Sequence, residues 1–180
     1  LMTDFWFNHF NVSLSKNQCA FYVPAYERDV IRPNVFGNFD DLLLKTAKSP
    51  AMLMYLDNSS STGTNVSIGK KLADVKNQNK KQGLNENDAS EGRELHTLGV
   101  DGGYTQSDVT QAAKVLTGWT IAPMGDNGYG AAMKNLIARV GEENLNKRGF
   151  VHDGDVLFTM NRHDNSAKTV LGKKFAAGGG

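Results

Sequence analysis

Residues 105–119 read TQSDVTQAAKVLTGW, and this stretch contains both ends of one helix. Thr105 and Asp108 have the spacing of a capping box, in which each side chain accepts a hydrogen bond from the other residue's backbone N–H. Gly118 then ends the helix, because glycine readily adopts the left-handed conformation that closes a helix. The stretch therefore predicts a helix from Ser107 to Thr117.

Other helices are predicted on both sides of this one. Ser49 followed by Pro50 is typical of a helix start, since serine caps the first turn and proline has no N–H that needs a partner there. In further segments, apolar residues recur at steps of three and four, the pattern of a helix with one buried face. The aromatic-rich first segment is expected to be buried as a helix. These further helices are expected over residues 3–10, 26–32, 40–48, 86–98 and 130–140.

Together the segments predict a mainly α fold, an irregular helical bundle with long loops. Residues 58–84 are rich in Asn, Ser, Thr, Gly and Lys and are longer than the loops of most compact domains, so a flexible insertion is expected there. Two β-favouring runs, 156–158 and 169–172, predict a small β-hairpin near the C-terminus. We expect residues 1–180 to form a single helical domain.

Composition excludes several classes of function. The chain has 20 Lys and Arg against 19 Asp and Glu, so no global charge favours binding to nucleic acid. Its lone cysteine, Cys19, allows neither an internal disulfide nor a thiolate zinc cluster. No apolar run approaches the roughly 18 residues that a membrane span needs. The standard hydrolase, zinc-protease and nucleotide-binding motifs do not occur, and no nucleophile is identified.

The most polar segment is 85–99, NENDASEGRELHTLG. In a helix, Glu91 shares an apolar face with Leu95 and Leu98, and a carboxylate in that position must be paired, protonated or bound to a metal ion. Glu94 lies one turn from Glu91, whereas His96 points largely to the other side. The candidate polar site consists of Asp57, Asn58, Asn85, Glu86, Asn87, Glu91, Glu94 and His96.

Two interpretations of this candidate site stay open. Glu91, His96 and Asp57 are candidate ligands of a divalent metal ion, the candidate cofactor: oxygen ligands suit calcium, and histidine favours zinc, manganese or iron. In the structural interpretation, acidic residues stabilise a helix start and Glu91 pairs with Arg32.

Two other histidines receive structural roles. His9, among aromatic residues, is expected to be a core histidine, and His163 with Asp164 is expected in a polar turn rather than as a functional Asp–His pair.

The motifs resemble the bacterial family catalogued as domain of unknown function 1800. The resemblance is carried by residues 94–106, ELHTLGVDGGYTQ, and by residues 116–120, LTGWT. It extends to segments within 5–10, 31–58 and 163–172, and it covers nearly the whole chain. Residues 88–93 depart from the family pattern, and Gly92 costs a helix about 1 kcal/mol relative to alanine.

The resemblance implies a mostly helical, exported bacterial protein that is longer than this chain and is found beside a second family of exported proteins. It implies no established activity. By this resemblance we expect a fragment of a larger protein, located in the periplasm or outside the cell, with a co-exported protein as its partner. A scaffold or partner-binding role is the favoured function. The alternative is a metal-dependent enzyme or metal-binding protein with its site around residues 85–103.

Overall fold

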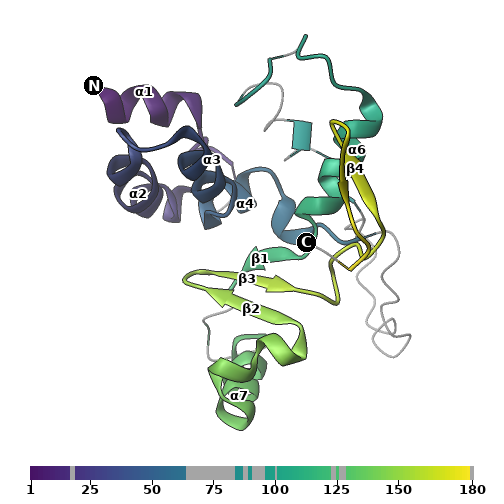
Figure 1. Cartoon of the computed structure of the whole chain (residues 1–180). Coiled ribbons are helices and arrows are strands. Elements are labelled where there is room, and N and C mark those ends of the chain that lie inside the picture. Colours follow the sequence, from purple (N-terminus) through teal and green to yellow (C-terminus); the bar gives the residue numbers. More distant parts are fainter. Residues whose placement is uncertain are drawn as a thin grey trace.

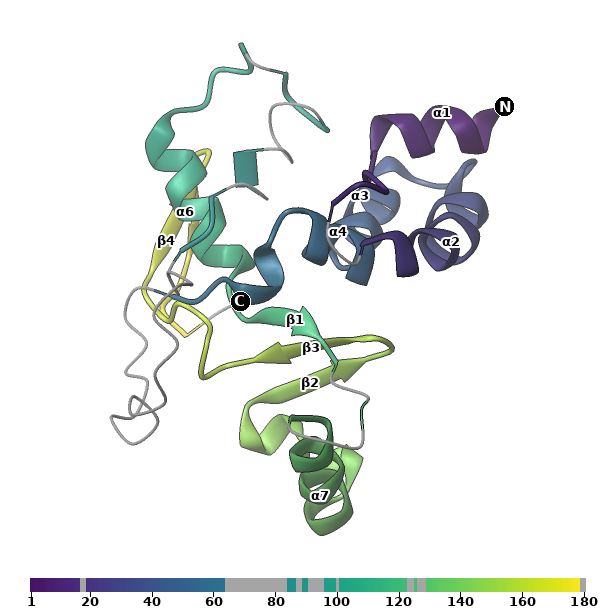
Figure 2. The same cartoon turned by 180° about the vertical axis from the view of Figure 1, so that it is seen from behind.

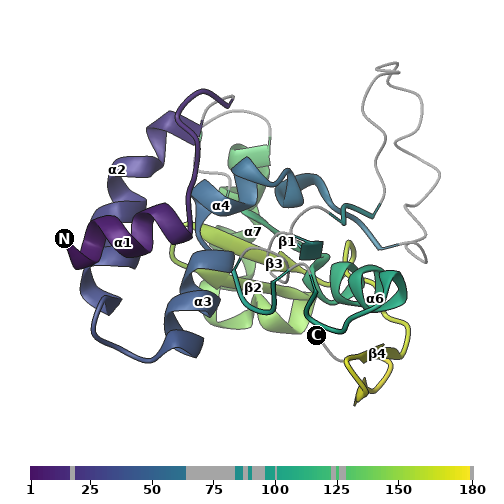
Figure 3. The same cartoon turned by 90° about the horizontal axis from the view of Figure 1, so that it is seen from above.

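The computed structural model describes residues 1–16, 19–63, 84–86, 89–90, 96–99, 101–122, 125 and 129–178. Within these ranges three groups of elements lie next to one another (Figures 1 and 2). The N-terminal helices form one group, a three-stranded sheet with α7 beside it forms the second, and helix α6 with a C-terminal β-hairpin forms the third. Seen from above, the sheet lies between the N-terminal helices and α6 (Figure 3).

The helices are short, and several are irregular. The residues Tyr26–Ile31 form a π-helix, η2, which continues from α2 and runs into a 3₁₀ turn, η3, at Arg32–Asn34. Further 3₁₀ turns are η1 (Cys19–Phe21), η4 (Asn58–Ser60), η5 (Glu142–Asn144) and η6 (Asn146–Arg148). The α-helices are α1 (Met2–His9), α2 (Val23–Ala25), α3 (Phe39–Ala47), α4 (Pro50–Tyr55), α6 (Gln106–Leu116) and α7 (Tyr129–Val140).

Two antiparallel sheets complete the described fold. The larger has the order β1-β3-β2, with Trp119 opposite Phe158 and His152 opposite Leu157. The smaller is a hairpin of two strands joined at Leu171 and Gly172. The strands are β1 (Trp119–Ile121), β2 (Phe150–Asp153), β3 (Val156–Thr159), β4 (Lys168–Val170) and β5 (Lys173–Phe175).

The predicted irregular helical bundle is therefore wrong, because a three-stranded sheet forms the middle of the fold. Its strands have only three or four residues, and every residue of β3 is buried. Strands of this kind show no polar and apolar alternation, which is the signal that identifies a strand in a sequence. Their aromatic and β-branched residues favour extended structure only once sequence-distant partners are in place.

The predicted hairpin is also corrected. A hairpin does lie near the C-terminus, but it is formed by β4 and β5, while residues 156–158 belong to the larger sheet. Part of the predicted insertion at 58–84 is packed rather than exposed, since Ser61, Thr62 and Gly63 are buried; residues 64–83 lie outside the described residues.

The local helix signals are confirmed. Thr105 and Asp108 form the full capping box at the start of α6, and Ser49 Oγ accepts a hydrogen bond from the Met52 N–H at the start of α4. Asp108 also accepts a hydrogen bond from the Leu171 N–H at 2.8 Å through its other oxygen, Oδ1. Asp108, a member of the capping box of α6, is therefore also hydrogen-bonded to the turn of the β4–β5 hairpin.

Helix α1 forms as predicted, but it is not buried. The chain enters the N-terminal core only at Phe10, just after α1, where the Tyr26 hydroxyl donates to the Phe10 carbonyl. In α1 itself no residue is fully buried, and Phe5 keeps 57% of its surface exposed. This core contains Phe10, Val12, Cys19, Val23, Tyr26, Ile31, Leu42, Ala51, Met52 and Leu56.

The described helices are too short for a bilayer. The longest, α7, has 12 residues, whereas a membrane-spanning helix needs about 20. No described helix is long and apolar enough to cross a membrane.

Gly118, between α6 and β1, has no room for a side chain. Its φ is +95°, and a Cβ there would lie 2.9 Å from a ring carbon of Phe158 and 3.0 Å from the Thr159 carbonyl oxygen. We expect Gly118→Ala to lower the free energy of unfolding by about 3 kcal/mol, through strain and overpacking together. Urea denaturation measures this loss.

Gly154 provides the matched control. Its φ is also positive, +59°, but no atom lies within 4 Å of the position that an alanine methyl group would take. Gly154→Ala should therefore cost only about 1 kcal/mol, the backbone strain alone. Equal losses in the two variants would show that packing around Gly118 is looser than described.

Candidate functional site

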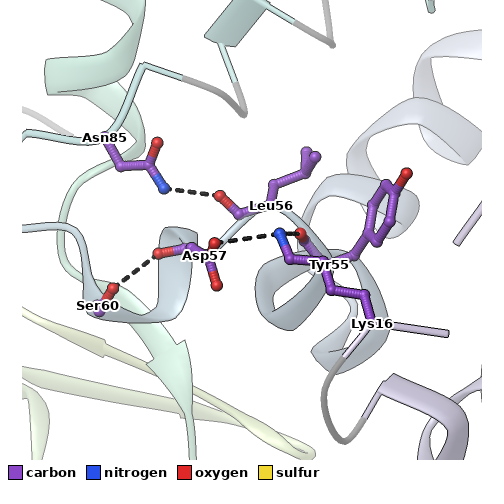
Figure 4. A network of polar contacts seen from close by, with 6 residues as sticks. All are labelled: Lys16, Tyr55, Leu56, Asp57, Ser60 and Asn85. Atoms are coloured by element: carbon purple, nitrogen blue, oxygen red, sulfur yellow. Dashed lines mark hydrogen bonds and ion pairs between the residues drawn. The ribbon is translucent and has the colours of Figure 1, made fainter. Parts of the chain in front are cut away.

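Asp57 lies at the centre of a polar network that joins three segments of the chain (Figure 4). It is one of the described non-glycine residues with positive φ, +58°, and it follows directly after the end of α4. Lys16 forms an ion pair with Asp57 at 3.1 Å and also donates to the Tyr55 carbonyl. Asn85 donates through its side-chain amide to the Leu56 carbonyl at 2.6 Å.

This network supplies hydrogen-bond donors to the carbonyl groups at the end of α4. The last turn of a helix leaves carbonyl groups without partners inside the helix. Lys16 and Asn85 supply the donors, and the positive charge of Lys16 also favours the negative end of the helix dipole. Asp57 and Asn85 both lie at the end of α4, and the contacts of Asn85 and Lys16 there are those of a helix end.

Asn58 is buried directly beside this turn. Its side chain keeps 1% of its surface exposed, and its amide nitrogen donates to the Leu116 carbonyl at 3.2 Å, at the end of α6. The amide oxygen has no hydrogen-bond partner among the described residues. Asn58 therefore links the end of α4 with the end of α6.

Glu86 points to α6 instead of to Asp57. Its carboxylate accepts hydrogen bonds from Thr110 Oγ1 at 2.8 Å and from the Gln106 side chain at 3.1 Å. A carboxylate near the start of a helix also interacts favourably with the helix dipole. Both contacts fit the structural interpretation of this residue.

His96 lies against α1. Its ring packs against Phe10 and His9, with centroid separations of 5.0 Å and 5.9 Å, and its backbone carbonyl lies 3.1 Å from His9 Nε2. Only 7% of the residue is exposed. Burial lowers the pKa of His96 from 6.5 to about 4, and the neighbouring His9 acts in the same direction. His96 is therefore neutral at pH 7.

The described candidate residues thus divide among three places: Asp57, Asn58 and Asn85 lie at the end of α4, Glu86 at α6 and His96 at α1. Arg32 pairs with Glu27, and its expected pairing with Glu91 stays a prediction because Glu91 lies outside the described residues. Within the described ranges, no three His, Cys, Asp or Glu side chains gather as a metal site. Asn87, Glu91 and Glu94 lie outside the described residues, so the metal-dependent alternative stays a prediction.

The most deeply buried polar cluster is one that the sequence analysis did not select. Thr117, His163 and Asp164 have no exposed surface, and Lys168 keeps only 2% exposed. His163 follows a turn, in which its N–H donates to the Met160 carbonyl, and both His163 and Asp164 are buried there. The cluster joins the end of α6, the segment after β3 and the first residue of β4.

The hydrogen bonds of this cluster show which nitrogen of His163 carries the proton and which groups accept from Lys168. His163 Nδ1 lies 2.8 Å from the Thr117 carbonyl, which only accepts, so this nitrogen carries the proton and Nε2 is the acceptor. Lys168 lies 3.4 Å from that Nε2 and also donates to the carbonyls of Asp164 and Ser166. The three N–H groups of the lysine thus have three acceptors.

The electrostatics of Lys168 follow from its burial. Loss of solvent lowers the pKa of the ammonium group below its usual value, while the nearby Asp164 opposes the shift. Nothing in the sequence around Lys168 distinguishes it from an exposed lysine in a short strand. The only local signal was its position at the start of a β-favouring run, beside a His–Asp pair.

Lys168→Met should lower the free energy of unfolding by about 3 kcal/mol, because the buried acceptors on His163, Asp164 and Ser166 lose their donor. Lys174→Met is the control: Lys174 is exposed on β5, and its replacement should change stability by less than about 0.5 kcal/mol. Urea denaturation compares the two variants. A stable Lys168→Met protein would contradict the structural role given to this cluster.

His96 should make the protein sensitive to mild acid. The unfolded chain binds a proton at His96 below about pH 6.5, whereas the folded chain binds it only near pH 4, so stability falls as the pH drops between these values. We expect a loss of roughly 2 kcal/mol from this residue between pH 7 and pH 5.

The measurement is urea denaturation of the wild type and of His96→Gln at both pH values. The variant should lose less stability than the wild type between pH 7 and pH 5, by the same roughly 2 kcal/mol. Parallel losses in the two proteins would show that His96 does not titrate as described.

Comparison with known proteins agrees with the motifs at residues 94–106 and 116–120. The family model described as "Protein of unknown function (DUF1800)" matches residues 1–180. No curated protein and no solved structure matches the chain. The chain belongs to the DUF1800 family of proteins of unknown function.

Proposed function

We propose that this chain is a noncatalytic scaffold that binds a partner protein through an exposed aromatic surface on α1, on α3 and on the segment between η3 and α3. The surface consists of Met2, Phe5, Trp6, Phe36 and Phe39. The observation that carries the proposal is the exposure of Met2, Phe5, Phe36 and Phe39, while Trp6, which contacts Phe5 and Phe39, is partly buried.

Three members of this surface, Phe5, Trp6 and Phe39, are connected by direct ring contacts. The rings of Phe5 and Trp6 lie edge to face at 5.1 Å, and Trp6 and Phe39 lie 5.9 Å apart. The indole N–H of Trp6 donates to the Val35 carbonyl at 3.2 Å, which places residues 35 and 36 beside it. Met2 lies one helical turn before Phe5 and Trp6 on α1.

The exposure is high for aromatic residues. Phe36 keeps 86% of its surface exposed and Phe39 keeps 39%. Single exposed apolar residues are common on soluble proteins, whereas contiguous groups mark binding surfaces. Aromatic residues and methionine are also the apolar types that protein–protein interfaces favour.

The charges around the surface indicate which partner it suits. Asp4 on α1 and Asp40 and Asp41 at the start of α3 lie next to its aromatic members in the chain. An acidic rim around an apolar centre attracts a partner with basic residues around an apolar face. We therefore propose a partner segment with this composition, on a protein exported together with this chain to the periplasm or the cell exterior.

The polar candidate residues support the same proposal. Asn85 and Glu86 make contacts inside the protein, at the end of α4 and on α6. These contacts give Asn85 and Glu86 structural roles, whereas internal packing does not account for the exposed aromatic residues.

The test is isothermal titration calorimetry between this chain and the exported protein encoded beside it. The double variant Phe5→Ser, Phe36→Ser should weaken binding by at least about a hundredfold, since central aromatic residues contribute most of the binding energy at interfaces. Leu171→Ser is the matched control, because Leu171 is 52% exposed at the tip of the β4–β5 hairpin and outside this surface.

Absence of binding by the wild type, or equal affinity of the double variant, would contradict the proposal. Sedimentation velocity of the chain alone tests a second explanation, in which the surface binds another copy of this chain. Self-association that disappears in the double variant would assign the surface to a second copy of this chain and would overturn the proposed heterologous partner.

A further inference from the structure

Phe36 is the most exposed residue of the aromatic surface, with 86% of its surface accessible to solvent. It lies between η3 and α3, in a turn where the Gly37 N–H donates to the Asn34 carbonyl at 3.0 Å. Val35, the first central residue of this turn, has φ −61° and ψ −22°, which are the values of a type I turn. Phe36 is therefore the second central residue of a type I turn.

The turn itself does not explain a phenylalanine at this position. Type I turns favour asparagine at the first position and glycine at the fourth, and Asn34 and Gly37 occupy these places. The core gives no reason either, because the Phe36 ring is exposed while the neighbouring Val35 packs against the N-terminal core. A large apolar side chain that neither the turn nor the core requires, beside other exposed aromatic residues, is expected to contact another molecule.

Four hydrogen bonds fix the backbone of this turn, one of them within the turn and three from other elements. The Asn34 side chain donates to the Val30 carbonyl of η2 at 2.6 Å and accepts from Lys45 Nζ of α3 at 2.8 Å. The indole N–H of Trp6, on α1, donates to the Val35 carbonyl at 3.2 Å. The turn is thus in place before a partner arrives, so binding loses less conformational entropy there.

The shape and the charges around Phe36 indicate what kind of surface it fits. A single ring that projects from a tight turn is complementary to a hollow rather than to a flat surface, and aromatic residues at interfaces fill such pockets. Asp40 and Asp41 are exposed in the first turn of α3, directly after Phe39. Positive charges at the edge of the hollow would complement these carboxylates.

We infer that Phe36 is the anchor of the partner complex and inserts its ring into an apolar pocket of the partner, whose rim carries lysine or arginine. Asn34 is a positioning residue, which acts by holding the turn that presents the ring. The inference rests on the proposed function, since it names the kind of partner that the aromatic surface binds. An aromatic anchor buried in a pocket is where the binding energy of an interface concentrates.

The experiment is isothermal titration calorimetry of single variants with the exported protein encoded beside this chain. Phe36→Ala should weaken binding by at least about thirtyfold, the loss of a central aromatic anchor, and Phe5→Ala should weaken it by less. Phe21→Ala is the matched control. Phe21 is 80% exposed in η1, outside the aromatic surface, so its replacement should leave the affinity unchanged.

A double-mutant cycle tests the role of Asn34. Asn34→Ala should weaken binding about fivefold in the wild-type chain, because the turn must then be ordered during binding. In the Phe36→Ala chain the same substitution should have no effect, since the ring that Asn34 positions is gone. Equal losses in the two chains would show that Asn34 supports the fold in general and does not position Phe36.

The single variants distinguish failure of this inference from failure of the proposed function. A wild type that does not bind contradicts both. If the wild type binds and Phe36→Ala binds equally well, or Phe5→Ala loses as much affinity, the aromatic surface stands and the anchor is wrong. Sedimentation of the wild type with phosphatidylcholine vesicles, abolished in Phe36→Ala, would assign the ring to a lipid surface and would also overturn the inference.

Discussion

The buried hydrogen bonds of Lys168 hold the second half of this fold together. The ammonium group reaches the His163 ring and two carbonyls of the segment 163–168, and the same His163 is bonded to Thr117 at the end of α6. Gly63 packs so closely against Asp164 that a Cβ there would lie 2.6 Å from the Asp164 Cα. Lys168, His163, Asp164 and Thr117 thus join β4, the segment after β3 and the end of α6. A buried charge is stabilising only while all of its partners are present, so these elements depend on one another.

The sequence predicts the parts of this fold that depend on neighbours in the chain. The capping box of Thr105 and Asp108 and the Ser49–Pro50 start are set by residues three positions apart or fewer, and both are confirmed. The three-stranded sheet depends on pairing Trp119 with Phe158, which no local pattern specifies. Burial of Lys168 depends on the acceptors in residues 163–166 and on packing against residues that are distant in the sequence. Composition and periodicity carry no signal for either arrangement.

The candidate site shows the same difference between what neighbouring residues determine and what sequence-distant residues determine. Asp57 and Asn85 lie at the end of α4, while Glu86 contacts α6 and His96 packs against His9 of α1. Residues only ten positions apart thus take partners in different elements. Helical spacing alone cannot distinguish these outcomes, because the partner of an exposed polar side chain is chosen by tertiary structure. Burial is equally hard to predict from a local pattern. The aromatic-rich segment of α1 was expected to be buried, but none of its residues is.

Asp108 joins two elements that are separate in the chain. One carboxylate oxygen accepts from Thr105 at the start of α6, and the other accepts from the Leu171 N–H in the turn of the hairpin. The first turn of α6 therefore cannot fray without also releasing the hairpin turn. In hydrogen-exchange terms, the amide protons of Thr105 and Leu171 belong to one opening unit, although 63 positions separate Asp108 from Leu171. A helix end is ordinarily the first part of a helix to open, but we expect this one to be as protected as the hairpin attached to it.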